Sequence, residues 1–205
     1  MHFSTVAPGD NRCGFQFTFA VLLILIVSAC TPSAPEPPPT DESRRQFTFP
    51  ADWIGDWKGT LNIWRPGADT AIQVPMELHV HPLQDTTRWT WTIVYGEGEK
   101  RAPREYELVA LNPEKGLYEV DEKNGILLKG YVIRNAFYGL FSVQGSLILD
   151  KYERKGEALE FEILSGQLGQ GRLSGDTVLA GNDTIPPVLD YPIQVAQRAV
   201  LYPVH

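Results

Sequence analysis

Strict alternation of apolar and polar residues is the feature that most limits the folds open to this chain. In residues 72–81, IQVPMELHVH, the side chains at even-numbered positions are apolar, and those at odd-numbered positions are Gln, Pro, Glu, His and His. Successive side chains of a β-strand point to opposite faces, so this pattern predicts a half-buried strand. Pro75 within it indicates an edge or a bulge, because proline cannot donate a ladder hydrogen bond.

Further segments with strand character follow at close spacing after Trp53. They cover residues 57–64, 88–95, 105–111, 117–121, 126–134, 137–143, 146–153, 159–164 and 171–180. Turn sequences separate them: Asn124-Gly125 suits a two-residue hairpin, and residues 112–116 and 154–157 suit longer turns. The chain is therefore predicted to be all-β, with consecutive strands paired antiparallel.

The number of strands favours a closed sheet. A flat sheet of about ten strands would expose two edges, so it should curl into a barrel or split into a sandwich. Short connections throughout favour an up-and-down barrel of about eight to ten strands, with a β-sandwich as the alternative. We assign the barrel to residues 47–205 and expect an irregular tail from about residue 181, where several prolines occur. Residues 193–201 are expected to form a last strand or a short helix.

The start of this domain carries a family resemblance. Residues 53–61, WIGDWKGTL, contain a Gly-x-Trp opening that resembles that of lipocalins and their calycin relatives. The resemblance implies a barrel around a cavity, with Trp57 closing one barrel end. The later lipocalin motifs are absent from the sequence, and nothing in it matches the haem-ligating histidine of nitrobindin-like relatives. No cofactor is therefore expected.

The N-terminal region predicts export and lipidation. Residues 15–27 form an apolar run shorter than the roughly 20 residues that span a bilayer. The run ends in Val27-Ser28-Ala29-Cys30, which resembles the lipobox of bacterial lipoproteins. This resemblance implies that residues 1–29 are a signal peptide and that Cys30 receives lipid. Little net positive charge precedes the apolar run, which departs from the usual pattern.

The segment after Cys30 has the composition of a tether. Residues 31–46, TPSAPEPPPTDESRRQ, are rich in proline and charge and contain almost nothing apolar, which is typical of an extended, solvated spacer. We therefore expect residues 30–46 to hold the domain at a membrane through lipid on Cys30. Thr31 stands where an aspartate would resemble an inner-membrane retention signal. The outer membrane is the expected location if the organism has two membranes.

Aromatic residues on alternate strand positions are the candidates for a ligand cavity. Trp89, Trp91 and Tyr95 share one face of a predicted strand, and Phe137, Phe141 and Phe161 are expected beside them. The same pattern also fits a barrel whose interior is completely filled. The sequence leaves both interpretations open.

One strand carries potential metal ligands. Glu77, His79 and His81 alternate along it and project from one face, and two imidazoles with a carboxylate suit zinc. The alternation also puts Met76, Leu78 and similar residues on the buried face, so an ordinary polar outer face is the alternative.

Charge and composition exclude several functions. The formal net charge is −7, and the one dense basic cluster, at Lys100, Arg101 and Arg104, fits a solvated loop, so nucleic-acid binding is not expected. The sequence has no nucleophile elbow, and its two cysteines lie in the predicted signal peptide and at the lipid site, so no enzyme activity is expected. The leading hypothesis is a tethered barrel that binds a small apolar or amphipathic ligand. The alternatives are a structural or interaction protein of the envelope with a filled barrel, and a metal-dependent enzyme.

Overall fold

A computed structural model describes residues 46–181 and 183–205 of the chain. The predictions for the signal peptide, for Cys30 and for all but the last residue of the tether lie outside this part. Within the described residues, no helix combines the length and the apolar character needed to cross a membrane.

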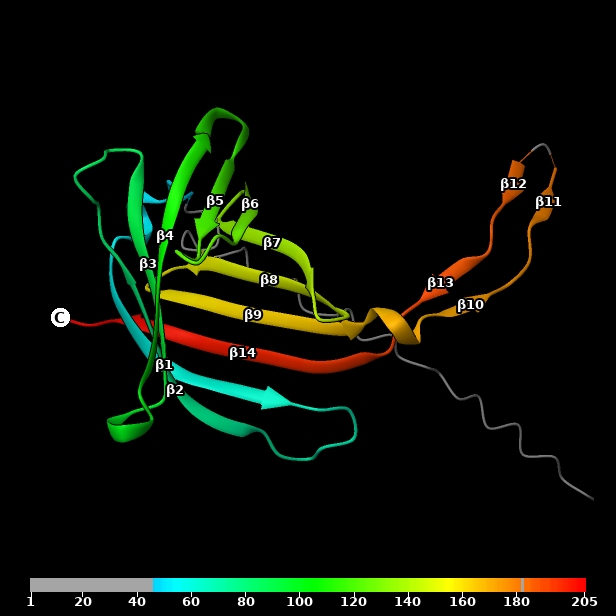
Figure 1. The fold of residues 1–205 in the computed structure, drawn as a ribbon, viewed down its shortest axis with the longest axis horizontal. Helices are drawn as coiled ribbons and strands as arrows, with labels where there is room; N and C mark the ends of the chain where they lie inside the picture. The colour runs from blue at the N-terminus through cyan, green and yellow to red at the C-terminus, as the bar shows by residue number, and fades with distance from the viewer. Residues whose placement is uncertain (1–45, 182) are drawn as a thin grey trace, which may run out of the picture. The chain divides into compact units, whose positions relative to one another are not determined.

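The described residues form a closed antiparallel barrel of ten strands (Figure 1). The strands β1 to β9 follow one another around the barrel, and β14 lies between β9 and β1 and closes it. This arrangement confirms the predicted up-and-down barrel and excludes the sandwich. The barrel strands are β1 Gly55–Trp64, β2 Ile72–Val80, β3 Arg88–Tyr95, β4 Ala102–Asn112, β5 Leu117–Asp121, β6 Leu127–Ile133, β7 Ala136–Val143, β8 Ser146–Lys155, β9 Ala158–Gln167 and β14 Ile193–Pro203.

Short 3-10 turns precede β1 at Ala51–Trp53, connect β3 with β4 at Gly98–Lys100 and β4 with β5 at Pro113–Lys115, and follow β9 at Leu168–Gln170. The best-defined of them is the turn between β4 and β5. The side chain of Asn112 accepts a hydrogen bond from the Lys115 N–H, and Gly116 follows with a φ of 66°. This is the left-handed conformation that glycine tolerates best, so the predicted turn at 112–116 forms for the expected reason.

Pro75 lies where β2 loses one of its neighbours. The pairing of β2 with β1 runs from Ile72 to Val80, whereas its pairing with β3 begins at Met76. The missing N–H of Pro75 therefore falls just outside the β2–β3 ladder. The strand edge that Pro75 indicated is therefore confined to residues 72–75, which pair with β1 but not with β3.

The region from residue 181 onward differs from the predicted irregular tail. It contains β14, in which Ala199 and Leu201 are buried against the interior. The prolines fall outside this strand, apart from Pro203 at its end. Because β14 pairs with both β9 and β1, ladder hydrogen bonds on two sides hold residues 193–203 extended.

An arm of four short strands lies between β9 and β14. It consists of β10 Arg172–Ser174, β11 Val178–Ala180, β12 Asp183–Ile185 and β13 Val188–Asp190, paired as β10 with β13 and β11 with β12. The single strand predicted over 171–180 is thus two strands, separated at Gly175, where φ is 80°. Every residue of these four strands is exposed.

One end of the barrel is packed with aromatic rings. We call it the closed end and define it by Phe47, Phe49, Trp53, Trp57 and Arg154. Trp57 is 3% exposed, and its indole N–H donates a hydrogen bond of 2.8 Å to the Trp53 carbonyl. The Arg154 guanidinium lies 4.5 Å from the centre of the Trp57 ring and 5.0 Å from that of Phe47. Rings and cation thus pack against one another at this end of the barrel.

Candidate functional site

The interior of the barrel contains a cavity of about 410 Å³ away from the closed end. A volume of this size falls within the range of roughly 300–1,000 Å³ usual for ligand pockets. The presence of this cavity argues against the alternative of a barrel whose interior is completely filled. The cavity is lined by Trp91, Ile93, Tyr95, Arg104, Tyr106, Val120, Glu122, Leu128, Lys129, Gly130, Phe137, Gly139, Phe141, Val143, Ile148, Asp150, Tyr152 and Ile163.

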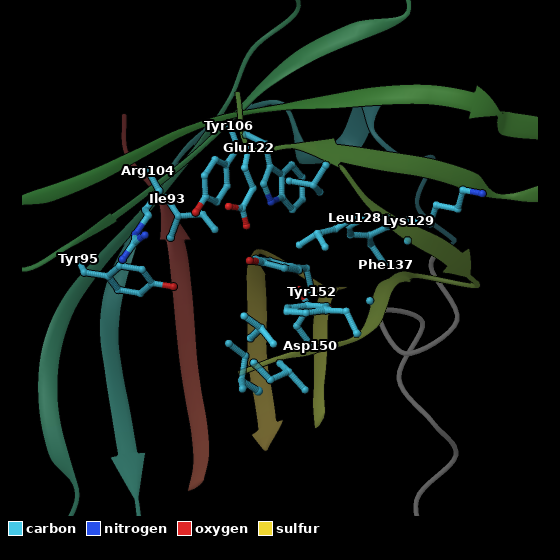
Figure 2. A pocket seen from close by; sticks show the side chains of 18 residues that line it. Ile93, Tyr95, Arg104, Tyr106, Glu122, Leu128, Lys129, Phe137, Asp150 and Tyr152 are labelled. Atoms are coloured by element: carbon cyan, nitrogen blue, oxygen red, sulfur yellow. The ribbon is translucent and has the colours of Figure 1, made fainter. Parts of the chain in front are cut away.

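Three packed rings, Trp91, Phe137 and Tyr152, line the cavity, and Figure 2 labels Phe137 and Tyr152 among the lining side chains. The ring centre of Trp91 lies 5.0 Å from that of Tyr152 and 5.6 Å from that of Phe137, both edge to face. On its other side Phe137 stacks on Phe49 of the closed end, with ring centres 5.2 Å apart. The same ring therefore supports the closed end and bounds the cavity.

Two paired glycines make room for interior side chains. Gly130 on β6 faces Gly139 on β7. A Cβ atom at Gly130 would lie 2.1 Å from the Phe137 ring, and one at Gly139 would lie 2.1 Å from Oδ1 of Asp150. Only glycine therefore lets both the Phe137 ring and the Asp150 carboxyl occupy the inside of the barrel here.

Asp150 is a half-buried acidic residue of the cavity lining. Burial raises the pKa of Asp150, and hydrogen bonds from the backbone N–H groups of Gly139 and of Asp150 itself offset only part of the rise. Its Oδ1 atom is buried and has no hydrogen-bond partner among residues 46–181 and 183–205. A buried acceptor without a partner costs about 1–3 kcal/mol. A bound molecule with a donor group at this point would remove that cost.

Tyrosines add hydroxyl groups to the same wall. Burial raises the pKa of Tyr95 to about 12, with Arg104 opposing the rise, and raises that of Tyr152 well above its ordinary value. Both phenols therefore stay protonated and can donate or accept a hydrogen bond at neutral pH. In Figure 2 the hydroxyls of Tyr106 and Tyr152 and the carboxylate of Glu122 point toward the same space. The cavity thus combines apolar walls with a few convergent polar groups.

Four of the six predicted cavity residues line it: Trp91, Tyr95, Phe137 and Phe141. Trp89 and Phe161 do not line it. Trp89 is half-buried and packs against the core, and Phe161 is fully buried with its ring centre 4.9 Å from that of Tyr152. Arg104, which was assigned to a solvated loop, belongs to β4 and lies at the cavity, because β4 begins at Ala102.

Sequence reasoning missed Asp150 and Tyr152. They alternate with Lys151 on β8, so the same period-two pattern puts them on the interior face with Ile148. The charge of Asp150 made this face look polar in the sequence. The two glycines opposite gave the available clue, since each permits a larger neighbour.

The predicted metal ligands lie outside the barrel, on the outer face of β1 and β2. The register places Asp56 opposite His79. Oδ1 of Asp56 lies 2.6 Å from Nδ1 of His79 and 2.8 Å from Nε2 of His81. Nε2 of His79 lies 3.2 Å from Oε2 of Glu77. The histidines thus face outward, as the alternation indicated, and Asp56 joins them across the ladder.

The protein is a closed ten-stranded barrel with an interior cavity. Comparison with known proteins finds a similarity at the level of the fold. No family model and no curated protein matches the chain. A crystal structure with a similar fold is that of a protein of unknown function from the DUF3598 family of Nostoc punctiforme PCC 73102. Its TM-score is 0.51 at 11% identity, over 75% of this chain and 48% of that one. The chain thus spans about half the length of that protein, and the similarity shows the fold alone.

Proposed function

We propose that this protein is a membrane-tethered envelope lipoprotein whose barrel binds a small apolar or amphipathic molecule. The cavity of about 410 Å³ is the observation that supports binding. Its walls of aromatic and aliphatic side chains favour an apolar body, because rings supply contact area with little loss of side-chain entropy. Asp150, Tyr95 and Tyr152 favour a ligand that also carries a hydrogen-bonding group.

A cavity-filling variant tests the binding. Ile148 lines the cavity on β8, and its neighbour Leu149 is 41% exposed on the outer face. Ile148→Trp should displace ligand volume, whereas Leu149→Trp adds the same ring outside the barrel. We expect the purified full chain in detergent to bind a fluorescent fatty-acid probe, Ile148→Trp to weaken binding at least tenfold, and Leu149→Trp to bind like the unchanged protein.

Two results would reject the ligand-binding proposal. One is an absence of saturable probe binding by the unchanged protein together with no small molecule in its organic extract by mass spectrometry. The other is equal binding by the two tryptophan variants, provided that both have the circular dichroism spectrum of the unchanged protein. Binding by the two variants alike would place the probe on the surface.

The tether is tested separately. Cys30→Ala should abolish labelling of the chain by radioactive palmitate and leave the signal peptide uncleaved by the lipoprotein peptidase. Cys13→Ala is the matched control, since Cys13 lies within the predicted signal peptide, and it should label normally. Normal labelling of Cys30→Ala would reject the lipid anchor and leave the binding proposal standing.

A further inference from the structure

The pairing of β1 with β2 gathers three potential metal ligands on the outside of the barrel, apart from the cavity. Asp56 stands opposite His79 in the register, and His81 follows directly after the end of β2, with its Nε2 2.8 Å from Oδ1 of Asp56. One oxygen or nitrogen atom of each residue lies within 4.8 Å of the others. All three side chains are between 27% and 46% exposed, so an ion from solvent can reach them.

From this geometry we propose that Asp56, His79 and His81 bind a divalent transition-metal ion of the zinc class. Two imidazole nitrogens and one carboxylate oxygen suit zinc, and three protein ligands leave a fourth position for water. A zinc ion held about 2.0–2.1 Å from each ligand atom separates tetrahedral ligands by roughly 3.3 Å. The two contacts of Asp56, at 2.6 and 2.8 Å, therefore lengthen when the ion binds.

The convergence on one oxygen atom supports a metal site rather than scattered surface pairs. Both imidazoles direct a nitrogen at the same atom, Oδ1 of Asp56, at 2.6 and 2.8 Å. A carboxylate oxygen flanked by two imidazole nitrogens supplies the kinds of donor atom that zinc binds, and each nitrogen must be unprotonated to bind the ion.

Glu77 gives an independent reason for this assignment. Its Oε2 lies 3.2 Å from Nε2 of His79, on the ring nitrogen that does not face Asp56. A ligating histidine ordinarily donates its second N–H to a carboxylate or carbonyl, which fixes the ring orientation and the tautomer. Glu77 is itself held by Arg101 at 3.2 Å and Lys58 at 3.5 Å. Glu77 is thus the residue that orients His79, and Asp56 is the third ligand.

The strand backbone that carries the site is fixed on both sides. The His81 N–H donates to the Thr90 hydroxyl at 2.9 Å, and the His81 carbonyl accepts from the Thr90 N–H at 2.8 Å. The Asp56 carbonyl accepts from the Val204 N–H at 2.8 Å. Leu78 and Val80, which alternate with the histidines, are fully buried. Ligands on such a frame need little ordering when the ion binds.

Zinc titration of the full chain tests the site. The protein is purified in detergent without a histidine tag, stripped with a chelator, and titrated with Zn²⁺ against a chromogenic competitor. We expect one tight zinc per chain, and His79→Ala or His81→Ala should weaken binding more than tenfold. Glu77→Gln should weaken it by about 10–100-fold through His79 orientation.

Two controls separate this site from other effects. His205→Ala removes a histidine outside the cluster and should leave zinc affinity unchanged. Ile148→Trp alters the cavity and should also leave it unchanged, so the metal site and the ligand proposal can fail independently. Circular dichroism without zinc should be the same for every variant, since the ligands are partly exposed. Less than stoichiometric zinc, or an equal effect of His205→Ala and His79→Ala, would overturn the proposal.

Discussion

The closed end and the cavity share strand β8 but use its side chains differently. At the closed end β8 contributes Arg154, whose guanidinium lies over the Trp57 ring and donates to the carbonyls of Asp52, Gly156 and Ala158. Asp150 lies four residues earlier on the same strand and lines the cavity. Its Oδ1 atom has no hydrogen-bond partner in the described part of the chain. At the closed end the Arg154 guanidinium is paired, although the Trp53 indole N–H is buried without a partner among the described residues, as is Oδ1 of Asp150 at the cavity.

This contrast assigns stability and binding to different regions. Well-packed rings and paired polar groups raise the free energy of unfolding, whereas empty volume and unpaired buried polar atoms reduce it. The cavity region is therefore the costly part of the fold. Substitutions at the closed end should have the largest effect on the free energy of unfolding. Substitutions at the cavity should affect ligand binding more than they affect stability.

The largest effect is expected from Trp57→Ala. It removes a large buried ring together with its hydrogen bond to the Trp53 carbonyl, and should lower the free energy of unfolding by about 3–5 kcal/mol. Urea denaturation followed by circular dichroism measures the change. Tyr202→Ala, at a residue 58% exposed, is the control and should stay within about 0.5 kcal/mol of the unchanged protein. A loss similar to that control would mean that Trp57 does not hold the closed end.

An intermediate effect is expected from Gly139→Ala at the cavity. The added Cβ would lie 2.1 Å from Oδ1 of Asp150, so the carboxyl must move or the strand must shift, at about 1–3 kcal/mol. Fatty-acid probe binding should fall as well, because the displaced carboxyl enters the ligand space. Gly169→Ala is the control, since nothing lies within 4 Å of its added Cβ. Unchanged stability and binding in Gly139→Ala would show that the glycine does not make room for Asp150.

The smallest effect is expected from Asp150→Asn, and it has the opposite sign. Because burial raises the pKa of Asp150 above 3.8, the folded state holds its proton more tightly than the unfolded state does. This group's contribution to stability is therefore greatest at low pH and is lost as the pH rises through the raised pKa. Asp150→Asn should be more stable than the unchanged protein at neutral pH, and the difference should disappear below pH 3.8. Urea denaturation at several pH values would show it, and a pH-independent difference would contradict it.

The barrel could be predicted because its strands obey alternation, and the errors lie where other forces decide. Residues 193–203 contain alanine, glutamine and arginine that also suit a helix, and only pairing with β1 and β9 makes them extended. The contact between Asp56 and His79 depends on the β1–β2 register, which the sequence pattern does not determine. Whether the barrel contains a cavity depends on whether side chains from opposite strands touch across its interior. The Trp91 and Phe137 rings meet, whereas the space beside Gly130 and Gly139 is taken by the Phe137 ring and the Asp150 carboxyl.

The seam between β1 and β14 has a consequence for the order of events during folding. Leu61 and Ala199 face each other across it, so the first strand of the barrel remains an unpaired edge until the last strand has arrived. Contacts this distant in sequence form slowly, because a long loop must close before they contribute. The barrel thus stays open until residues 193–203 pair with β1, and a factor that shields a bare strand edge would have its greatest effect during that interval.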